Sequence, residues 1–135
     1  MKRIDHIAVA VENLEEALRF YQEALGLPCL GIETVAEQGV RVAKLDAGNT
    51  HIELLEPLNA DTPVGKFLNQ RGQGLHHICF GVDDIDCELK QLQSTNTRLI
   101  DKTPKIGAGG AQIAFVHPKS TGGVLMELAQ LKDEH

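Results

Sequence analysis

The spacing of apolar residues predicts a strand and then a helix at the start of the chain. In IDHIAVAV (4–11), Ile7, Val9 and Val11 alternate with the residues between them, which is the period of a β-strand. Across residues 14–25, apolar side chains return every three or four positions, as they do on one face of an amphipathic helix. We therefore expect one half-buried strand followed by one helix.

Three short strand candidates follow this helix. Asn13 and Glu16 resemble a capping box at the helix start, and Gly26 stands where the helix would end. The pair Gly48 and Asn49 suits a hairpin turn between the last two strands. The strand candidates are about 29–35, 39–46 and 50–55. The first part of the chain is therefore predicted to have the order βαβββ.

The same order of residue types returns about 71 positions later. The stretch DHIAVAVENLEEALRFYQ (5–22) can be placed over HHICFGVDDIDCELKQLQ (76–93), although few residues are identical. The second part has a strand candidate at about 76–82, a helix at about 84–94, and strands near 97–101, 111–117 and 123–129. The sequence thus predicts an α+β fold of two βαβββ modules, which would pack about a pseudo-two-fold axis.

The length of 135 residues suits one domain. We expect a single domain over residues 1–135, with module 1 at about 1–57 and module 2 at about 74–131. The connection at about 58–73 includes a short helix near 63–70.

The alignment of the two modules separates the adjacent histidines of GLHHICF (74–80). His77, and not His76, is the counterpart of His6, and neighbours in a strand point to opposite faces. Small residues share the predicted face of each aligned histidine, namely Ala8, Ala10, Cys79 and Gly81. Small side chains beside a histidine leave room, so this face is predicted to line a cavity. His76 is predicted to have a structural role.

One glutamate stands in the last strand of each module. Glu53 lies in HIELLEP and Glu127 in VLMELAQ, both between apolar neighbours. A carboxylate inside an apolar strand is costly unless it is paired or bound to a metal. If the modules pack about a two-fold axis, the two glutamates converge with His6 and His77. Two imidazoles and two carboxylates suit a divalent first-row metal ion.

Composition limits the classes of partner and compartment. Thirteen basic and 19 acidic residues give a net charge of -6, which argues against a nucleic-acid surface. Three cysteines without a CxxC pair argue against a disulfide framework and fit a reducing, cytoplasmic location. The chain has no signal-peptide pattern and no apolar run of the roughly 20 residues that span a bilayer, so no membrane partner is expected.

Several stretches resemble the vicinal oxygen chelate (glyoxalase) superfamily and, within it, the methylmalonyl-CoA epimerase family. They are IDHIAVAV (4–11), GNTHIELLEPL (48–58), GLHHICFGVDDID (74–86) and KIGAGGAQIAFVHPKSTGGVLMELAQ (105–130), of which the last is the most specific. The resemblance implies a half-barrel metal cavity and a homodimer. It implies a divalent metal ion held by His6, Glu53, His77 and Glu127, with cobalt favoured and zinc, nickel or manganese as alternatives.

The resemblance also implies a CoA thioester substrate that loses a proton from C2 and regains it on either face, through a metal-stabilised enolate. Glu127 and Glu53 are the catalytic acid/base candidates. A bacterial family member has a further candidate glutamate three residues after the glycine of a QGV motif. Here that motif is Gln38-Gly39-Val40, and Val42 stands at the position. Its substitute is then Glu37 or Glu53.

Three residues are candidate substrate contacts. Gln38 belongs to the QGV motif, and Lys105 opens the glycine-rich run KIGAGGAQ (105–112). Lys119 follows the turn signal His117-Pro118. Both lysines could contact an anion.

Two other functions fit the same residues. A glyoxalase I-type lactoylglutathione lyase would use similar ligands and also moves a proton through an enediolate. A non-enzymatic ligand-binding protein of the same fold is the further alternative. The four ligand-type side chains argue against this last class.

Overall fold

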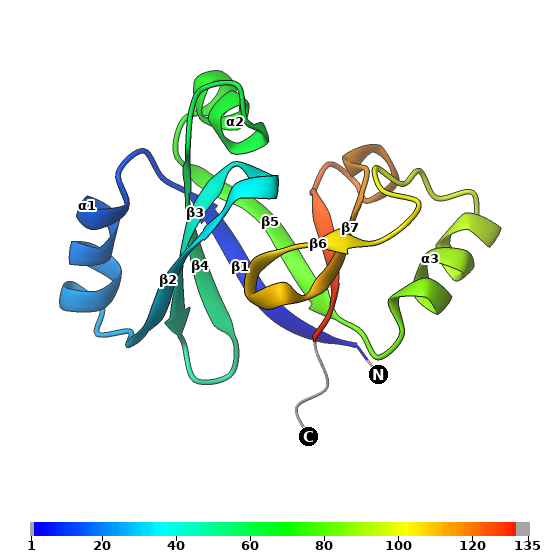
Figure 1. Cartoon of the computed structure of the whole chain (residues 1–135), viewed down its shortest axis with the longest axis horizontal. Helices are drawn as coiled ribbons and strands as arrows, with labels where there is room; N and C mark the ends of the chain where they lie inside the picture. Colours follow the sequence, from blue (N-terminus) through cyan, green and yellow to red (C-terminus); the bar gives the residue numbers. More distant parts are fainter. Residues whose placement is uncertain (1, 132–135) are drawn as a thin grey trace. The chain divides into compact units, whose positions relative to one another are not determined.

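The computed structural model describes residues 2–131 in two compact units. Residues 6–76 form the first, and residues 2–5 with 77–131 form the second. The predicted single domain over 1–135 also includes residues 1 and 132–135, which lie outside the described part. Figure 1 shows the helices and strands of both units, which are described separately below.

The first unit is a four-stranded sheet with one helix along its face. The strand order is β2-β3-β4-β1, in which β1 and β4 are parallel and the other pairs are antiparallel. Its elements are β1 (Arg3–Ala10), α1 (Leu14–Leu18), the π-helical η1 (Arg19–Ala24), β2 (Cys29–Val35), the 3-10 turn η2 (Ala36–Gln38), β3 (Val40–Asp46), β4 (His51–Pro57) and α2 (Pro63–Arg71). The predicted βαβββ order of this module is confirmed.

The second unit repeats the arrangement with the strand order β5-β8-β7-β6. Here β5 and β8 are parallel, and β7 is antiparallel to both of its neighbours. Its elements are β5 (Gly74–Gly81), α3 (Ile85–Ser94), β6 (Lys105–Ile106), η3 (Ala108–Gly110), β7 (Gln112–Val116), η4 (Pro118–Ser120) and β8 (Met126–Gln130). The α+β class with two βαβββ modules is therefore confirmed.

The predicted strand near 97–101 is wrong, because β6 lies later in the chain. At this place only Leu99 forms an isolated bridge, with Val116. The amides of Ile100 and Asp101 both donate to the same carbonyl, that of Phe115. The Asp101 side chain in turn accepts the Phe115 amide at 2.8 Å. A side chain thus occupies a donor that a regular backbone ladder would use.

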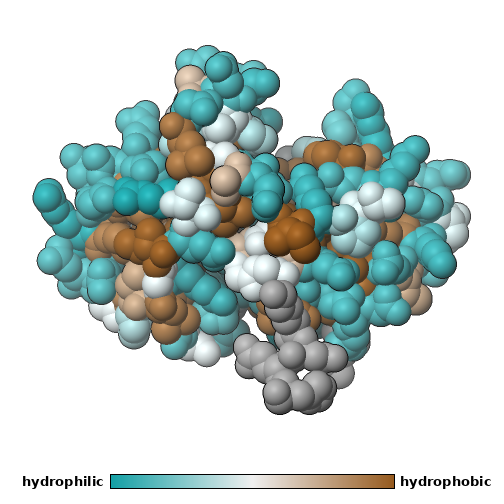
Figure 2. All heavy atoms as spheres, viewed as in Figure 1, coloured by the Kyte–Doolittle hydropathy of each residue, from teal (hydrophilic) through white to brown (hydrophobic). Residues whose placement is uncertain are grey.

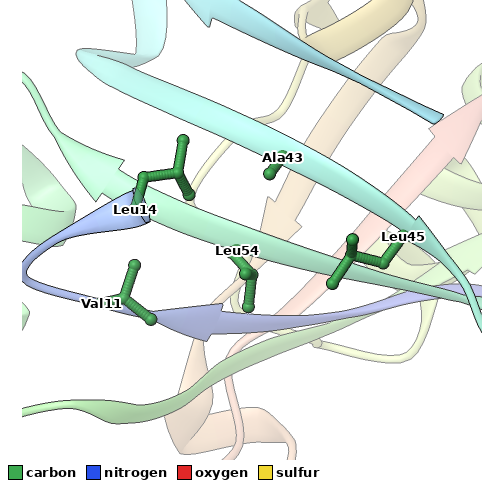
Figure 3. Close-up of a cluster of buried hydrophobic side chains, with 5 residues drawn as sticks. All are labelled: Val11, Leu14, Ala43, Leu45 and Leu54. Carbon is green, nitrogen blue, oxygen red and sulfur yellow. The ribbon is translucent and has the colours of Figure 1, made fainter. Parts of the chain in front are cut away.

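Each sheet buries its apolar face against a helix. In the first unit, Val11, Leu14, Ala43, Leu45 and Leu54 form the buried cluster drawn in Figure 3. In the second, the corresponding cluster is Val82, Ile85, Leu89, Ala114 and Leu128. The repeat extends to strand register, since Ala43 faces Leu54 and Ala114 faces Leu128. Burying these faces directs the opposite faces of β1 and β5, with their histidines, away from the helices.

The helix starts are held in the same way in both units. Asn13 accepts the Glu16 amide at 3.0 Å, and Asp84 accepts the Cys87 amide at 3.1 Å. The first amide of each helix is also bound, since Leu14 donates to Glu56 and Ile85 donates to Gln130. These acceptors stand three residues after Glu53 and Glu127, respectively. The last strand of each module therefore both carries the glutamate and fixes the helix.

Hydrophilic side chains cover much of the face shown in Figure 2, with apolar residues between them. The large exposed apolar side chains include Phe20, Leu25 and Leu75. Among residues 2–131, no helix has the length and apolar character that a bilayer crossing requires.

Candidate metal centre and active site

In the first unit, His6 and Glu53 form a buried pair. His6 is 5% exposed and Glu53 is 7% exposed. The His6 Nδ1 atom lies 3.3 Å from Glu53 Oε2. Strands β1 and β4 run parallel with Ala8 opposite Glu53, so the glutamate sits beside the residue two positions after the histidine. The pairing register, and not the sequence separation, brings the two side chains together.

In the second unit, His77 and Glu127 form the corresponding pair. Both residues are 6% exposed, and His77 Nε2 lies 2.9 Å from Glu127 Oε1. Strands β5 and β8 run parallel with Cys79 opposite Glu127. The residue that faces the glutamate is therefore again two positions after the histidine. Both units use one local design.

The residues that face the glutamates are small and fully buried. Ala8 and Cys79 each have 0% of their surface exposed. A larger side chain at either position would compete for the space beside the carboxylate. These small residues explain how an imidazole and a carboxylate can lie side by side in a sheet.

The geometry of each pair fits metal coordination. Two ligand atoms about 2.1 Å from one ion and about 90–110° apart are separated by about 3.0–3.4 Å. The separation is 3.3 Å in the first pair, within this range, and 2.9 Å in the second, just below it. An imidazole nitrogen and a carboxylate oxygen at such a distance can share either a metal ion or a proton. Each pair supplies one nitrogen and one oxygen, the donor set that divalent first-row metals accept.

The surroundings of the two pairs differ. Across β3 and β4, Lys44 stands opposite Glu53, whereas across β7 and β8, Phe115 stands opposite Glu127. The Phe115 ring lies edge-on to the His77 ring, with centroids 5.5 Å apart. The His6–Glu53 pair thus has a lysine on the neighbouring strand, whereas the His77–Glu127 pair has a phenylalanine there. Lys44 is not among the residues predicted from the sequence, although side-chain alternation along β3 assigns it to one face of that strand.

Lys105 belongs to the surroundings of the second pair. Its ammonium group lies 5.2 Å from the Phe115 ring centroid and 3.1 Å from Asp101 Oδ1. The ion pair with Asp101 neutralises part of its charge. The structure therefore places the predicted contact Lys105 beside Phe115, in the same unit as His77 and Glu127.

Other residues singled out from the sequence lie elsewhere. The His76 ring packs edge-on against Phe67 of α2, with centroids 4.9 Å apart, in line with its predicted structural role. Gln38 ends the turn η2 before β3, whereas Glu53 pairs with the far part of that strand. Lys119 lies in η4. Phe115, the residue opposite Glu127, lies inside β7, whereas Lys119 lies beyond the end of that strand.

Val42 fills the position where a bacterial family member has a glutamate. It is 5% exposed, and it faces Leu55 on β4 and Glu33 on β2. The side chain has no proton to transfer. Glu37, one proposed substitute, is an exposed residue of η2, whereas Glu53 is buried beside His6. Of the two candidate substitutes for the missing glutamate, Glu53 therefore lies closer to the buried histidine than the exposed Glu37.

Comparison with known proteins decides the family. The model of the glyoxalase/bleomycin resistance protein/dioxygenase superfamily matches residues 5–115. The mitochondrial methylmalonyl-CoA epimerase of Mus musculus is 42% identical over 129 residues, which cover 95% of this chain and 72% of that protein. The chain belongs to the methylmalonyl-CoA epimerase family of this superfamily.

Two further epimerases agree with this assignment. The ethylmalonyl-CoA/methylmalonyl-CoA epimerase of Cereibacter sphaeroides is 38% identical over 96% of this chain and 98% of its own length. The crystal structure of the Mycobacterium tuberculosis methylmalonyl-CoA epimerase superposes with a TM-score of 0.92 at 34% identity, covering 96% of this chain and 88% of that one. The family resemblance, the fold and the class of enzyme expected from the sequence are therefore confirmed.

Proposed function

We propose that this epimerase-family protein interconverts the two C2 epimers of methylmalonyl-CoA. The observation that carries the proposal is the recurrence of one buried His–Glu pair, in one strand register, in both modules of a chain from this family. A buried carboxylate beside an imidazole is a group that can hold and release a proton. Two such pairs supply the two carboxylates that proton exchange on both faces of C2 requires.

We further propose that His6, Glu53, His77 and Glu127 together bind one divalent metal ion, with cobalt favoured. The spacing within each pair, 3.3 Å and 2.9 Å, suits two adjacent ligands of such an ion. When bound, the ion would act as a Lewis acid toward the negative charge that develops on the thioester oxygen. The homodimer implied by the resemblance stays a prediction, which the mass in solution would test.

The carboxylates of Glu127 and Glu53 carry the proton steps in this proposal. One removes the C2 proton, which is acidic because it is α to the thioester carbonyl, and the other returns a proton on the opposite face. In the reverse direction the two exchange roles. His6 and His77 hold the carboxylates at fixed positions through the contacts described above. Phe115 borders the His77 ring, so one side of this imidazole faces an apolar group.

The experiment that tests this function is deuterium uptake at C2 of methylmalonyl-CoA in D2O, followed by NMR. It is run on the protein as prepared, after EDTA treatment, and after cobalt(II) is restored. A methylglyoxal–glutathione assay is run beside it. We expect exchange that EDTA abolishes and cobalt restores, with no lyase turnover.

Other results would change the assignment in defined ways. Exchange that survives complete metal removal would reject the metal-dependent mechanism and leave the epimerase. Lyase turnover without C2 exchange would replace the epimerase by the glyoxalase I-type alternative. No turnover in either assay by a metal-loaded protein would reject both enzymatic functions.

A further inference from the structure

A cluster of three basic side chains lies in the second unit, at the end of β7. It consists of Arg98, His117 and Lys119, and it is distinct from the His–Glu pair. His117 follows β7 directly, Lys119 lies in the turn η4, and Arg98 precedes the Leu99 bridge. In a chain with a net charge of -6, two cationic side chains beside a histidine call for an explanation.

Hydrogen bonds donated by backbone amides hold the three residues together. The His117 amide donates to the Arg98 carbonyl at 2.9 Å, and the Arg98 amide donates to Ser120 Oγ at 2.8 Å. The Lys119 amide donates to His117 Nδ1 at 3.0 Å. These bonds fix the segment 117–120 against Arg98. The backbone positions that carry the three side chains are therefore held at fixed places relative to one another.

The contact at Nδ1 also fixes the imidazole tautomer. Because Nδ1 accepts the Lys119 amide, neutral His117 carries its proton on Nε2 and can donate it outward. Partial burial, followed by the positive charges of Arg98 and Lys119, lowers the pKa of His117. Burial is the larger cause of this lowered pKa, and the two cations add to it in the same direction.

The positive charge of the cluster is not neutralised within the described chain. Among residues 2–131, neither the Arg98 guanidinium nor the Lys119 ammonium forms an ion pair. The acid nearest to Arg98 along the described chain, Asp101, already pairs with Lys105 and accepts the Phe115 amide. A guanidinium fork, an ammonium group and an N–H donor together match the oxygens of a phosphate ester.

We propose that Arg98, His117 and Lys119 bind a phosphate group of the substrate's CoA moiety. This inference rests on the proposed function for the identity of the ligand. CoA carries phosphate in two places, the 3′-phosphate and the pyrophosphate, and both present the same chemistry to the cluster. His117 lies two residues beyond Phe115, which borders His77, so the cluster belongs to the same unit as one of the catalytic pairs.

The first test compares three substrates, namely methylmalonyl-CoA, its dephospho-CoA analogue without the 3′-phosphate, and methylmalonyl-pantetheine without any phosphate. We expect the double variant Arg98→Gln/Lys119→Gln to raise KM for methylmalonyl-CoA about tenfold or more at unchanged kcat. With methylmalonyl-pantetheine the variant and the wild type should have equal KM values. Lys90→Gln, an exposed lysine of α3, is the control and should leave all three KM values unchanged.

The dephospho-CoA substrate identifies which phosphate is bound. A KM effect that disappears with this analogue assigns the cluster to the 3′-phosphate, and an effect that persists assigns it to the pyrophosphate. An equal KM rise for all three substrates would mean a general structural defect and overturn the proposal. No KM change for any substrate would overturn it as well.

A second measurement does not depend on turnover. Adenosine 3′,5′-bisphosphate is titrated into the wild type while the His117 ring is followed by NMR. We expect the phosphate to raise the pKa of His117, and the double variant to lose this response. If the protein catalyses C2 exchange but the nucleotide does not change the pKa of His117, the phosphate site is overturned and the proposed reaction is not. A His117 response in a protein without C2 exchange would support the site and reject the proposed reaction.

Discussion

His77 Nε2 and Glu127 Oε1 lie 2.9 Å apart in the buried part of the second unit. This contact links the first and last strands of a module at the level of single atoms. Its counterpart in the other unit joins His6 to Glu53 at 3.3 Å. Because each pair depends on a parallel strand register, a substitution in it tests chemistry at a position that the sheet itself keeps in place.

Glu127→Gln should keep the fold and remove most of the activity. The amide retains the size of the carboxylate but cannot accept a proton from C2, and loss of a positioned acid/base costs about 10²–10⁴-fold in rate. The measurement is C2 deuterium exchange together with the circular dichroism spectrum. Glu23→Gln, in the exposed part of η1, is the matched control. Near wild-type exchange by Glu127→Gln would remove this residue from the mechanism.

His77→Ala should lose bound metal, whereas His76→Ala should keep it. His77 lies beside Glu127, but His76 packs on Phe67 of α2. Metal content by elemental analysis of the purified proteins distinguishes the two. We expect His76→Ala to lower the unfolding temperature through lost packing while retaining stoichiometric metal. The opposite pattern would reject the register on which the site is built.

His117 should titrate below the ordinary histidine pKa of about 6.5, because partial burial and the charges of Arg98 and Lys119 favour its neutral form. A folded pKa below the unfolded one means that the unfolded chain binds the proton first. The contribution of His117 to stability is therefore present above the unfolded pKa, and it is lost as the pH falls through the folded pKa.

An NMR titration of the ring measures this pKa directly. Arg98→Gln should raise the pKa of His117 toward the ordinary value, whereas Lys90→Gln should leave it unchanged. If the ring of the wild type titrates above the ordinary value, the two cations do not act on it as described.

Leu54→Ala should destabilise the first unit by about 2–5 kcal/mol, because Leu54 has 0% exposure and the truncation leaves a cavity. The same change at Leu75, which is 71% exposed, should cost no more than about 0.5 kcal/mol. Urea unfolding of both variants measures the difference. Equal midpoints would mean that the cluster in Figure 3 contributes little to stability.

The sequence predicted most of the fold because the hydrophobic period is local. Strand alternation at Ile7, Val9 and Val11 and the helical spacing after Asn13 placed β1 and α1. The strand predicted at 97–101 failed because the Asp101 side chain takes the Phe115 amide, a contact between segments that no local pattern reveals. Side-chain competition for backbone groups is decided only once the chain has folded.

The sequence by itself determined which side chains are the candidates for the chemistry. The repeat singled out His6, Glu53, His77 and Glu127, because a two-residue period assigns each strand residue to one face. Tertiary structure decided which atoms meet, namely Nδ1 of His6 but Nε2 of His77, and it placed Lys44 beside one glutamate and Phe115 beside the other. It also joined Arg98 to His117. Such neighbours come from strand register and loop closure, which depend on contacts between residues that are distant along the chain.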